Sequence, residues 1–343
     1  MRHINIPVFI PHLGCPNQCI FCNQKYISGV TDFDEALVKK QIDDVLSTVG
    51  SDCCCEIAFF GGSFTGIDRS LMIRLLDLAQ GYVAKGAVMG IRMSTRPDYI
   101  STEIIEILKK YTITCVELGI QTMNDEVLRY LKRGHTVKDT FEAIRLLKSS
   151  GIDFVGQMMV GLPNATAEDE IFCAEQICAL GAAGARIYPT LVFKNTELEH
   201  LTYSGAYLPL SLEDAVARSA TVLEVFFKNN VPCIRIGLCD SENLHSDDTF
   251  VAGPSSPSIG EMVKSRMYYN KIFQMLKNSR DYFGCSLIIE CGKGYVYQVV
   301  GNKRKNIVEI KNRFGIKSIS VRESSGLDFM ELKIEVKEEN SCD

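Results

Sequence analysis

Gly14-Cys15-Pro16-Asn17-Gln18-Cys19-Ile20-Phe21-Cys22 is the stretch that decides the fold of this chain. Its cysteines follow the spacing C-x3-C-x2-C, which places three thiolates on one short loop. Thiolates are soft ligands that suit an iron–sulfur cluster or zinc. A structural zinc site uses four ligands, whereas three thiolates on a [4Fe–4S] cluster leave one iron open to a small molecule. The spacing favours a cluster held by Cys15, Cys19 and Cys22, with the Phe21 ring beside the open iron; zinc or plain buried cysteines are the alternatives.

Composition bounds the class of protein. The chain has 343 residues, of which 46% are hydrophobic, so it has material for a core and length for about two domains. The formal net charge of −5 does not indicate general nucleic-acid binding, although a local basic patch remains compatible with it. The sequence contains no run of about twenty apolar residues, so we do not expect a membrane span. The first residues lack the apolar core of an export signal, so we expect a cytoplasmic protein without a membrane partner.

The fourteen cysteines do not indicate a secreted disulfide scaffold. They are scattered through apolar runs of a large chain, which is typical of reduced thiols in a cytoplasm. Cys53, Cys54 and Cys55 form a triplet that could suggest a second metal site. Because the triplet leads directly into the apolar run 57–60, we predict that it begins a strand.

Short apolar runs alternate with amphipathic stretches along most of the chain. The predicted strands are 6–11, 56–60, 88–93, 115–120, 154–160 and 186–192. The predicted helices are 34–49, 68–84, 101–110, 124–132, 137–149 and 167–180. A polar stretch at 194–209, a helix at 211–229, a short strand at 233–238, a loop at 239–257 and a helix at 259–278 follow.

Six strands that are each followed by helical sequence predict a parallel sheet with right-handed crossovers. A closed eight-fold barrel needs about 250 residues, and the six repeats here end by residue 192. The expected fold class is therefore α/β, a partial (β/α)6 TIM-like barrel with a small C-terminal α+β domain. Sites in such folds collect at the C-terminal ends of strands, and the cysteine loop directly follows the first strand.

The cysteine loop resembles the signature of the radical S-adenosylmethionine enzymes, whose pattern is C-x3-C-x-(aromatic)-C. In that family the open iron chelates the methionine amino and carboxylate groups of S-adenosylmethionine. One electron from the cluster then breaks a sulfur–carbon bond and gives a 5′-deoxyadenosyl radical. The resemblance implies a [4Fe–4S] cluster and S-adenosylmethionine as cofactors, a partial barrel, and a reductant such as flavodoxin or ferredoxin.

The resemblance also implies residues that hold the cofactor. The family's second strand end often reads Gly-Gly-Glu, with backbone carbonyls on the methionine amino group, and this chain has Gly61, Gly62 and Ser63 there. Segment 156–163 is similar to the family's adenine-side motif. The cofactor-binding residues predicted in this way, together with polar residues at the other strand ends, are Phe21, Gly61, Gly62, Ser63, Ser94, Gln121, Met158 and Tyr188. No catalytic residue beyond the cluster ligands is predicted.

A longer set of strings resembles the Elp3-type branch of the family. They are segments 15–22, 61–66, 94–98, 117–122, 133–136, 156–163 and 186–190. Elp3 proteins modify the wobble uridine of transfer RNA with a radical domain joined to an acetyltransferase domain. No segment of this chain has the length or the glycine-rich loop of that acetyltransferase, so the acetyl chemistry does not carry over. The oxygen-independent coproporphyrinogen oxidase type shares the cysteine loop and remains an alternative.

The C-terminal segment bears on the substrate. Its predicted order is strand 285–290, helix 295–300, turn 301–304, helix 305–314 and strands 317–321 and 329–336, which resembles a KH RNA-binding module. The turn Gly-Asn-Lys-Arg lacks the second glycine of the KH loop, but Lys303, Arg304 and Lys305 gather positive charge there. The alternative is a small cap with a solvated basic face. The predicted domains are 1–250 (barrel), 251–280 (connecting helix) and 281–343 (accessory domain).

Together these patterns predict a radical enzyme whose favoured substrate is an RNA base, in transfer RNA. A small-molecule or porphyrin oxidoreductase is the enzymatic alternative. An RNA-binding protein with a structural or redox-sensing cluster is the non-enzymatic one. The sequence does not indicate an oligomeric state.

Overall fold

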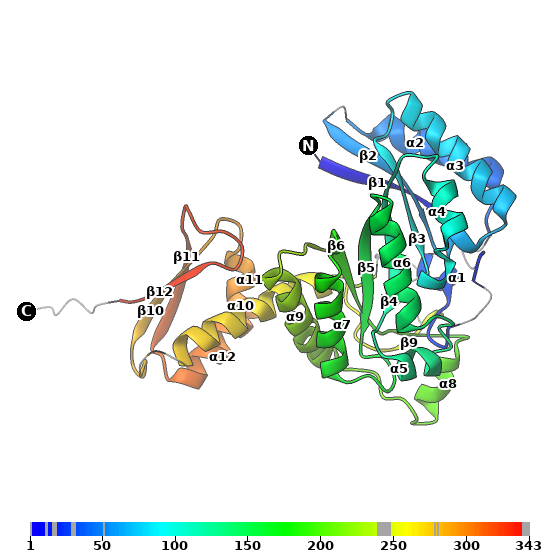
Figure 1. Cartoon of the computed structure of the whole chain (residues 1–343). Coiled ribbons are helices and arrows are strands. Elements are labelled where there is room, and N and C mark those ends of the chain that lie inside the picture. Colours follow the sequence, from blue (N-terminus) through cyan, green and yellow to red (C-terminus); the bar gives the residue numbers. More distant parts are fainter. Residues whose placement is uncertain are drawn as a thin grey trace, which may run out of the picture. The chain divides into compact units, whose positions relative to one another are not determined.

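The computed structural model describes residues 2–10, 13–15, 19–28, 32–50, 52–238, 248–277, 279 and 281–337, with only the backbone of Arg2 and Ser28. The chain divides into two compact units, which are described separately (Figure 1). Unit 1 comprises residues 1–212 and 225–255, and unit 2 comprises residues 213–224 and 256–343. Helix α9 (Leu212–Lys228) contributes residues to both.

Unit 1 is built on a seven-stranded sheet with the order β1-β2-β3-β4-β5-β6-β8. The strands are β1 (Arg2–Phe9), β2 (Cys53–Phe60), β3 (Gly90–Thr95), β4 (Ile113–Gln121), β5 (Asp153–Val160), β6 (Gly184–Pro189) and β8 (Cys233–Ile236). Every adjacent pair is parallel. Because the strands are parallel, all their carboxyl ends meet at one edge, where the connecting loops can form a site.

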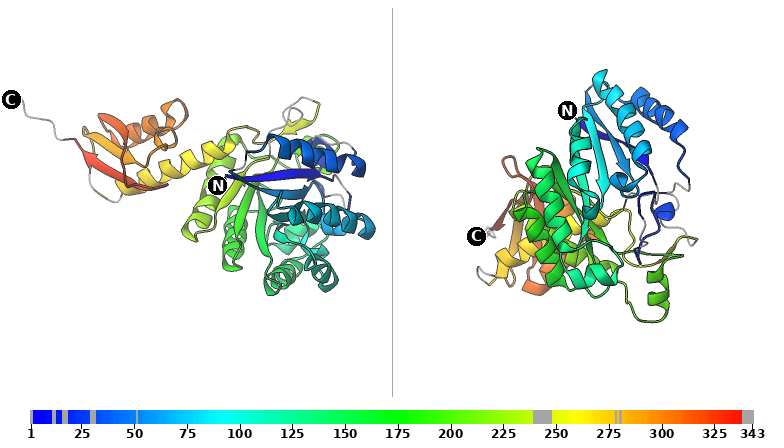
Figure 2. Two further views of the ribbon diagram at one scale, coloured as in Figure 1. Left: turned by 90° about the horizontal axis from the view of Figure 1, so that it is seen from above. Right: turned by 45° about the vertical axis from the view of Figure 1, so that its right-hand side comes forward.

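Helices line the outer side of this curved sheet (Figures 1 and 2). They are α2 (Glu35–Thr48), α3 (Arg69–Ala84), α4 (Thr102–Leu108), α5 (Asp125–Tyr130), α6 (Val137–Ser149) and α7 (Ala167–Ala179). Among them, α2 contacts β1, α3 contacts β3, and α6 and α7 contact β5. The smaller elements of unit 1 are α1 (Gln24–Ser28), β7 (Val192–Phe193), α8 (Glu197–Tyr203), β9 (Phe250–Ala252) and the 3-10 turns η1 (Phe64–Gly66) and η2 (Pro97–Tyr99).

Local sequence explains where the helices begin. Thr136 accepts a hydrogen bond from the backbone of Asp139, whose side chain accepts one from the backbone of Thr136. The same reciprocal capping box starts α7 at Thr166 and Asp169. Each box satisfies amide groups that lack an intrahelical partner, so these helices begin at a defined residue.

The predicted α/β partial barrel is confirmed, with differences in detail. The short strand predicted at 233–238 joins the same sheet as a seventh member, paired with β6. The polar stretch at 194–209, for which no helix was predicted, contains α8, which Thr196 caps by accepting from the backbone of Glu199. The cysteine triplet 53–55 begins β2, as expected. Pro11, which the first predicted strand included, and residues 239–247 of the predicted loop 239–257 lie outside the described residues. The described part of that loop contains the short strand β9.

Unit 2 has a three-stranded sheet in the order β11-β10-β12. Its elements are α10 (Ile259–Lys277), β10 (Ser286–Cys291), α11 (Val296–Val300), η3 (Asn302–Arg304), α12 (Lys305–Phe314), β11 (Ser318–Glu323) and β12 (Leu332–Val336). Strand β10 pairs parallel with β11 and antiparallel with β12. The predicted order strand–helix–turn–helix–strand–strand is therefore present.

Two buried residues hold unit 2 together. The Tyr268 ring is fully buried against Phe329 in an edge-on contact, and its hydroxyl accepts a hydrogen bond from the Met330 backbone. The Asn306 amide donates to the carbonyls of Ser265 and Val299. This amide fixes the first turn of α12 against α10 and α11, because leaving it unpaired in the core would cost free energy. In the described part of the chain, no helix is long and apolar enough to span a membrane.

Candidate functional site

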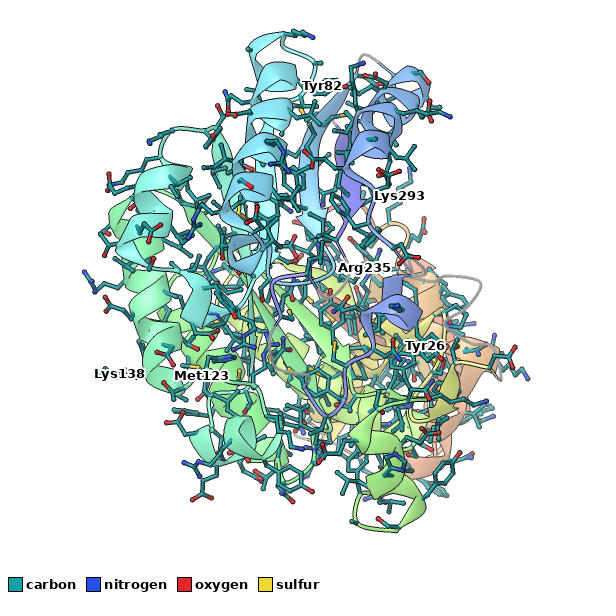
Figure 3. The ribbon with its side chains drawn as sticks, turned by 90° about the vertical axis from the view of Figure 1, so that its right-hand side faces the viewer. Tyr26, Tyr82, Met123, Lys138, Arg235 and Lys293 are labelled. Carbon is teal, nitrogen blue, oxygen red and sulfur yellow. The ribbon has the colours of Figure 1, made fainter. Side chains whose placement is uncertain are left out.

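One pocket opens at the carboxyl ends of the strands of unit 1, and the three motif cysteines line it. The pocket is also lined by Phe21, Gln24, Gly61, Gly62, Ser63, Ser94, Arg96, Glu117, Gly119, Gln121, Arg133, Gln157, Met159, Arg186 and Tyr188. The pocket therefore draws on every strand end from β2 to β6. Figure 3 looks onto the face that carries α1, where Tyr26 is labelled.

Backbone hydrogen bonds hold the cysteine loop in place. The Ile20 amide donates to the Leu131 carbonyl at 3.2 Å, and the Leu198 amide donates to the Ile20 carbonyl at 2.8 Å. Within the loop, the Cys22 amide donates to the Cys19 carbonyl at 3.0 Å. Residue 20 is thus held by two segments that are more than a hundred residues away in sequence.

The loop also packs directly on the turn that follows β2. Gly14 has φ +77°, and a Cβ atom there would lie 2.3 Å from the Ser63 carbonyl oxygen. Only glycine allows both this backbone conformation and this approach. The contact brings Cys15 within 3.5 Å of the Ser63 hydroxyl, measured from Sγ to Oγ.

The strand ends beside this turn are linked by hydroxyl groups. The Ser94 hydroxyl donates to the Gly62 carbonyl at 3.4 Å. Thr65 and Thr95, both buried, share a hydrogen bond between their hydroxyls at 2.7 Å. These bonds join the ends of β2 and β3, so the predicted residues Gly61, Gly62, Ser63 and Ser94 lie along one rim of the pocket.

Gln121 ends β4 in an unusual backbone conformation. Its φ is +67°, and the register between β4 and β5 shifts between Gly119 and Gln121. Non-glycine residues with positive φ are uncommon and often occur at functional sites. The side chain of Gln121 is buried and lines the pocket.

The floor of the pocket is charged. The Glu117 carboxylate, 1% exposed, lies 2.7 Å from Arg186 Nε and accepts a hydrogen bond from Arg186 Nη2 at 2.9 Å. It also accepts from Gln157 at 2.9 Å and from Arg92 at 3.4 Å. Arg92 in turn lies 3.1 Å from the Glu56 carboxylate. Opposite charges at these distances offset the cost of burying each other.

For two predicted residues on strands, the face of the sheet decides whether the side chain lines the pocket. Tyr188 lines the pocket, as predicted, but Met158 does not. Met158 is fully buried, and its neighbour Met159 lines the pocket in its place. The correction follows from the pleat, because successive residues of a strand point to opposite faces.

Three further residues were not among the predicted cofactor-binding residues, and two of them, Arg96 and Arg133, line the pocket. Arg96 is 2% exposed, lines the pocket, and binds Asp98 through Nε at 2.9 Å and through Nη2 at 2.5 Å. Arg133 donates a hydrogen bond from Nη1 to Cys19 Sγ at 3.4 Å. His135 is 3% exposed, and neither ring nitrogen has a hydrogen-bond partner among the described residues. Burial, followed by the charges of Arg133 and Arg96, lowers the pKa of His135 to about 3, so its ring is neutral.

The donor set at the cysteines fits an iron–sulfur cluster. Cys15, Cys19 and Cys22 are free thiols on one pocket wall. Burial, with the neighbouring Cys19 and Cys15, raises the pKa of the Cys22 thiol to about 12. Positive charge at the site is needed to ionise such a thiol, and bound metal supplies it. Buried N–H groups of Arg96 (Nη1) and Arg133 (Nε), which have no partner within the described residues, add cationic character to the same wall.

No three Cys, His, Asp or Glu side chains among the described residues converge on a point that could hold a single metal ion. A cluster does not require such convergence, because each cysteine binds a different iron atom. The lack of a single-ion site therefore does not count against a cluster held by the three cysteines.

Comparison with known proteins identifies the family. The Radical SAM superfamily model matches residues 9–174, and the Radical_SAM C-terminal domain model matches residues 182–269. An uncharacterized protein of Methanocaldococcus jannaschii is 30% identical over 234 residues, which are 64% of this chain and 70% of that protein. A tRNA uridine(34) acetyltransferase of the same organism is 32% identical over 54% of this chain and 38% of its own length.

Further similarities lie with Elongator complex protein 3. The human protein is 38% identical over 141 residues, which are 39% of this chain and only 25% of that protein. The structure of an archaeal Elp3 from Methanocaldococcus infernus superposes with a TM-score of 0.60 at 23% identity, covering 78% of this chain and 63% of that one. The structural match covers 78% of this chain, whereas the sequence match to the human protein covers 39%, so the fold is shared over a larger part of the chain. The chain belongs to the radical S-adenosylmethionine (radical SAM) superfamily and is homologous to Elp3 proteins.

Proposed function

We propose that this protein is a radical SAM enzyme that cleaves S-adenosylmethionine reductively at a [4Fe–4S] cluster bound by Cys15, Cys19 and Cys22. The observation that carries the proposal is the single pocket that these cysteines share with the strand ends at 61–63, 94 and 121. One electron passed to S-adenosylmethionine there supplies a 5′-deoxyadenosyl radical. We propose that the electron comes from a flavodoxin or a ferredoxin.

The chain's own residues bind, orient and shield the reactants. Gly61 and Gly62 offer backbone carbonyls at the rim, where the absence of side chains allows close approach. Ser63, Ser94 and Gln121 supply polar groups beside them. Phe21, Met159 and Tyr188 give the pocket apolar surface that excludes water from a reactive radical. We assign the cofactor-binding role predicted for Met158 to Met159, because Met159 is the residue that lines the pocket.

A reconstituted sample tests this proposal. We expect about four iron and four sulfide per chain, and 5′-deoxyadenosine when dithionite and S-adenosylmethionine are added. Cys19→Ala should abolish both. Cys178→Ala is the matched control, because Cys178 lies on α7 outside the pocket-lining set and should leave both unchanged. Full iron content in Cys19→Ala would contradict the ligand assignment.

We further propose that the substrate is a base of transfer RNA. Support comes from the relatives, two of which are named as tRNA uridine(34) acetyltransferase and Elongator complex protein 3. The chain spans only 38% and 25% of those relatives, so the reaction they complete is not carried over. The proposed division of the chain is a barrel (1–250), a connecting helix (251–280) and an RNA-binding accessory domain (281–343).

The proposed RNA contacts are in the turn between α11 and α12. Lys303 and Arg304 are exposed, and both have positive φ, at +50° and +63°. Lys305 lies 2.9 Å from the Glu213 carboxylate and 3.7 Å from the Glu309 carboxylate. Because these carboxylates offset its charge, we assign the stronger phosphate contacts to Lys303 and Arg304.

The substrate is tested by comparing modified nucleosides in transfer RNA from cells with and without the gene. We expect one modified nucleoside to be lost without the gene and restored by the wild type but not by Cys19→Ala. An unchanged nucleoside profile, with active cofactor cleavage in vitro, would contradict the RNA substrate and favour a small molecule.

A further inference from the structure

Each of the three motif sulfurs has a hydrogen-bond partner, and for Cys15 and Cys19 that partner comes from a distant segment of the chain. The Ser63 hydroxyl lies 3.5 Å from Cys15 Sγ, and Gln24 Nε2 donates to Cys22 Sγ at 3.5 Å. Arg133 Nη1 donates to Cys19 Sγ at 3.4 Å. A cysteine that binds metal has lost its proton, so its sulfur can only accept. All three contacts are then donations to sulfur.

Arg133 is held in place for this contact. Its Nη2 donates to the Gly119 carbonyl at 2.9 Å, and a Cβ atom on residue 119 would lie only 2.4 Å from that nitrogen. Glycine at 119 therefore makes room for the guanidinium group. The turn that carries Arg133 is itself bonded to the cysteine loop, through the Ile20 amide and the Leu131 carbonyl.

Charge distinguishes Arg133 from the other two donors. Ser63 and Gln24 are neutral, whereas a guanidinium group is always charged. Within the described residues Arg133 forms no ion pair, unlike Arg96, which binds Asp98, and Arg186, which binds Glu117. Its charge is therefore not offset by an adjacent carboxylate. Reduction adds a negative charge at the cluster, and a partly buried cation next to a ligand sulfur favours the reduced state.

We propose that Arg133 is a positioning residue that donates a charged hydrogen bond to Cys19 and thereby raises the reduction potential of the cluster. Ser63 and Gln24 act in the same direction with smaller effects. This inference rests on the proposed function, because it requires a cluster at the three cysteines. It concerns how easily the centre accepts an electron, which is a property separate from the substrate.

An EPR-monitored redox titration of the reconstituted protein, without S-adenosylmethionine or RNA, measures this property. We expect Arg133→Gln to lower the equilibrium constant for reduction at least tenfold, which corresponds to about 59 mV for one electron. Arg133→Lys keeps the charge but loses the fork and should lie between this variant and the wild type. Ser63→Ala should give a smaller shift in the same direction. Lys138→Gln removes the same charge at an exposed position on α6 and should not shift the potential.

A second route keeps the inference testable if Arg133→Gln binds iron poorly. Gly119→Ala leaves Arg133 in the chain but places a methyl group 2.4 Å from the present position of Nη2, which must then move, so it should lower the potential as well. Full iron content with an unchanged potential in Arg133→Gln, or in both Arg133→Lys and Gly119→Ala, overturns the inference. Weaker binding of S-adenosylmethionine with an unchanged potential overturns it too and assigns Arg133 to the cofactor carboxylate.

The outcomes separate the two proposals. A wild-type protein that forms no cluster removes both. A wild-type protein that forms the cluster and produces 5′-deoxyadenosine, while the potential does not respond to Arg133, removes only this inference.

Discussion

Glu117 shows how individual residues shape the pocket floor. Its carboxylate is buried between the guanidinium groups of Arg186 and Arg92, and Gln157 donates to the same group. Removing one partner of a buried pair leaves the other charge without compensation, which costs far more than the pair itself contributes. The Glu117 carboxylate therefore matters for folding as well as for the shape of the pocket.

We predict that Glu117→Gln lowers the free energy of unfolding by about 3–5 kcal/mol, measured by chemical denaturation. The double variant Glu117→Leu with Arg186→Met removes both charges and should be less destabilised than the sum of the two single changes. Additive effects in this cycle would show that the two side chains do not interact energetically.

His135 supplies a pH-dependent contribution to stability. Burial and the charges of Arg133 and Arg96 lower its pKa from 6.5 to about 3 in the folded protein. The unfolded chain therefore binds a proton at a pH where the folded protein does not. The unfolding free energy that depends on His135 is at its full value above pH 6.5 and decreases as the pH falls toward 3.

We predict that His135→Phe reduces the loss of stability on acidification. Between pH 7.5 and 5 the wild type should lose about 2 kcal/mol more unfolding free energy than the variant, because one unit of pKa shift corresponds to about 1.4 kcal/mol. Unfolding titrations at several pH values measure this difference. Parallel stability curves for the two proteins would refute the assignment.

The success of sequence reasoning differed among residues for physical reasons. The cysteine loop was visible because its ligands lie within eight consecutive residues. Arg133 was not, because its role depends on Cys19, 114 residues away. Choosing Met158 over Met159 was an error of one residue, and along a strand one residue reverses the face. Spacing within a segment could thus be predicted, whereas contacts between segments could not.

At the scale of elements, helices with a clear periodicity and a cap could be predicted from the sequence, whereas short polar elements could not. The helix 137–149 was predicted at its observed bounds because its apolar stripe and its cap at Thr136 are both local. Helix α8 was missed because its seven residues are mostly polar and too few for a periodic pattern. A strand was predicted at the position of β8, but its membership of the main sheet was not, because that depends on pairing with β6.

Two glycines in different elements should respond oppositely to alanine. Gly81 is exposed within α3, and a Cβ atom there would meet nothing within 4 Å. Gly156 on β5 faces α7, and a Cβ atom there would lie 2.7 Å from Ile177 Cγ2. We predict that Gly81→Ala stabilises the protein by about 0.5–1 kcal/mol. Gly156→Ala should destabilise it by about 1–3 kcal/mol, because the core between β5 and α7 has no room.

Thermal and chemical denaturation of the two variants check this pair of expectations against the same wild type. A stabilising effect of Gly156→Ala would mean that α7 can move away from β5 at little cost. Loss of stability in Gly81→Ala would mean that the outer surface of α3 is covered.

At the scale of the whole molecule, the proposed division of labour places radical chemistry in unit 1 and RNA binding in unit 2. Each unit has its own sheet and its own buried core. The pocket lies entirely within unit 1, and the basic turn lies in unit 2. Binding of RNA and cleavage of the cofactor should therefore be separable by mutation.

We predict that Lys303→Glu combined with Arg304→Glu weakens transfer RNA binding and leaves cofactor cleavage without RNA unchanged. Both positions have positive φ with long side chains, so glutamate introduces no new backbone strain. If each residue contacts one phosphate, the slope of log affinity against log salt should fall by about two. The matched control is Lys109→Glu with Lys110→Glu, which makes the same charge change on exposed residues of unit 1. Equal affinity and equal salt dependence in both double variants would mean that RNA, if bound, approaches by another surface, because a backbone contact must respond to reversal of its charge.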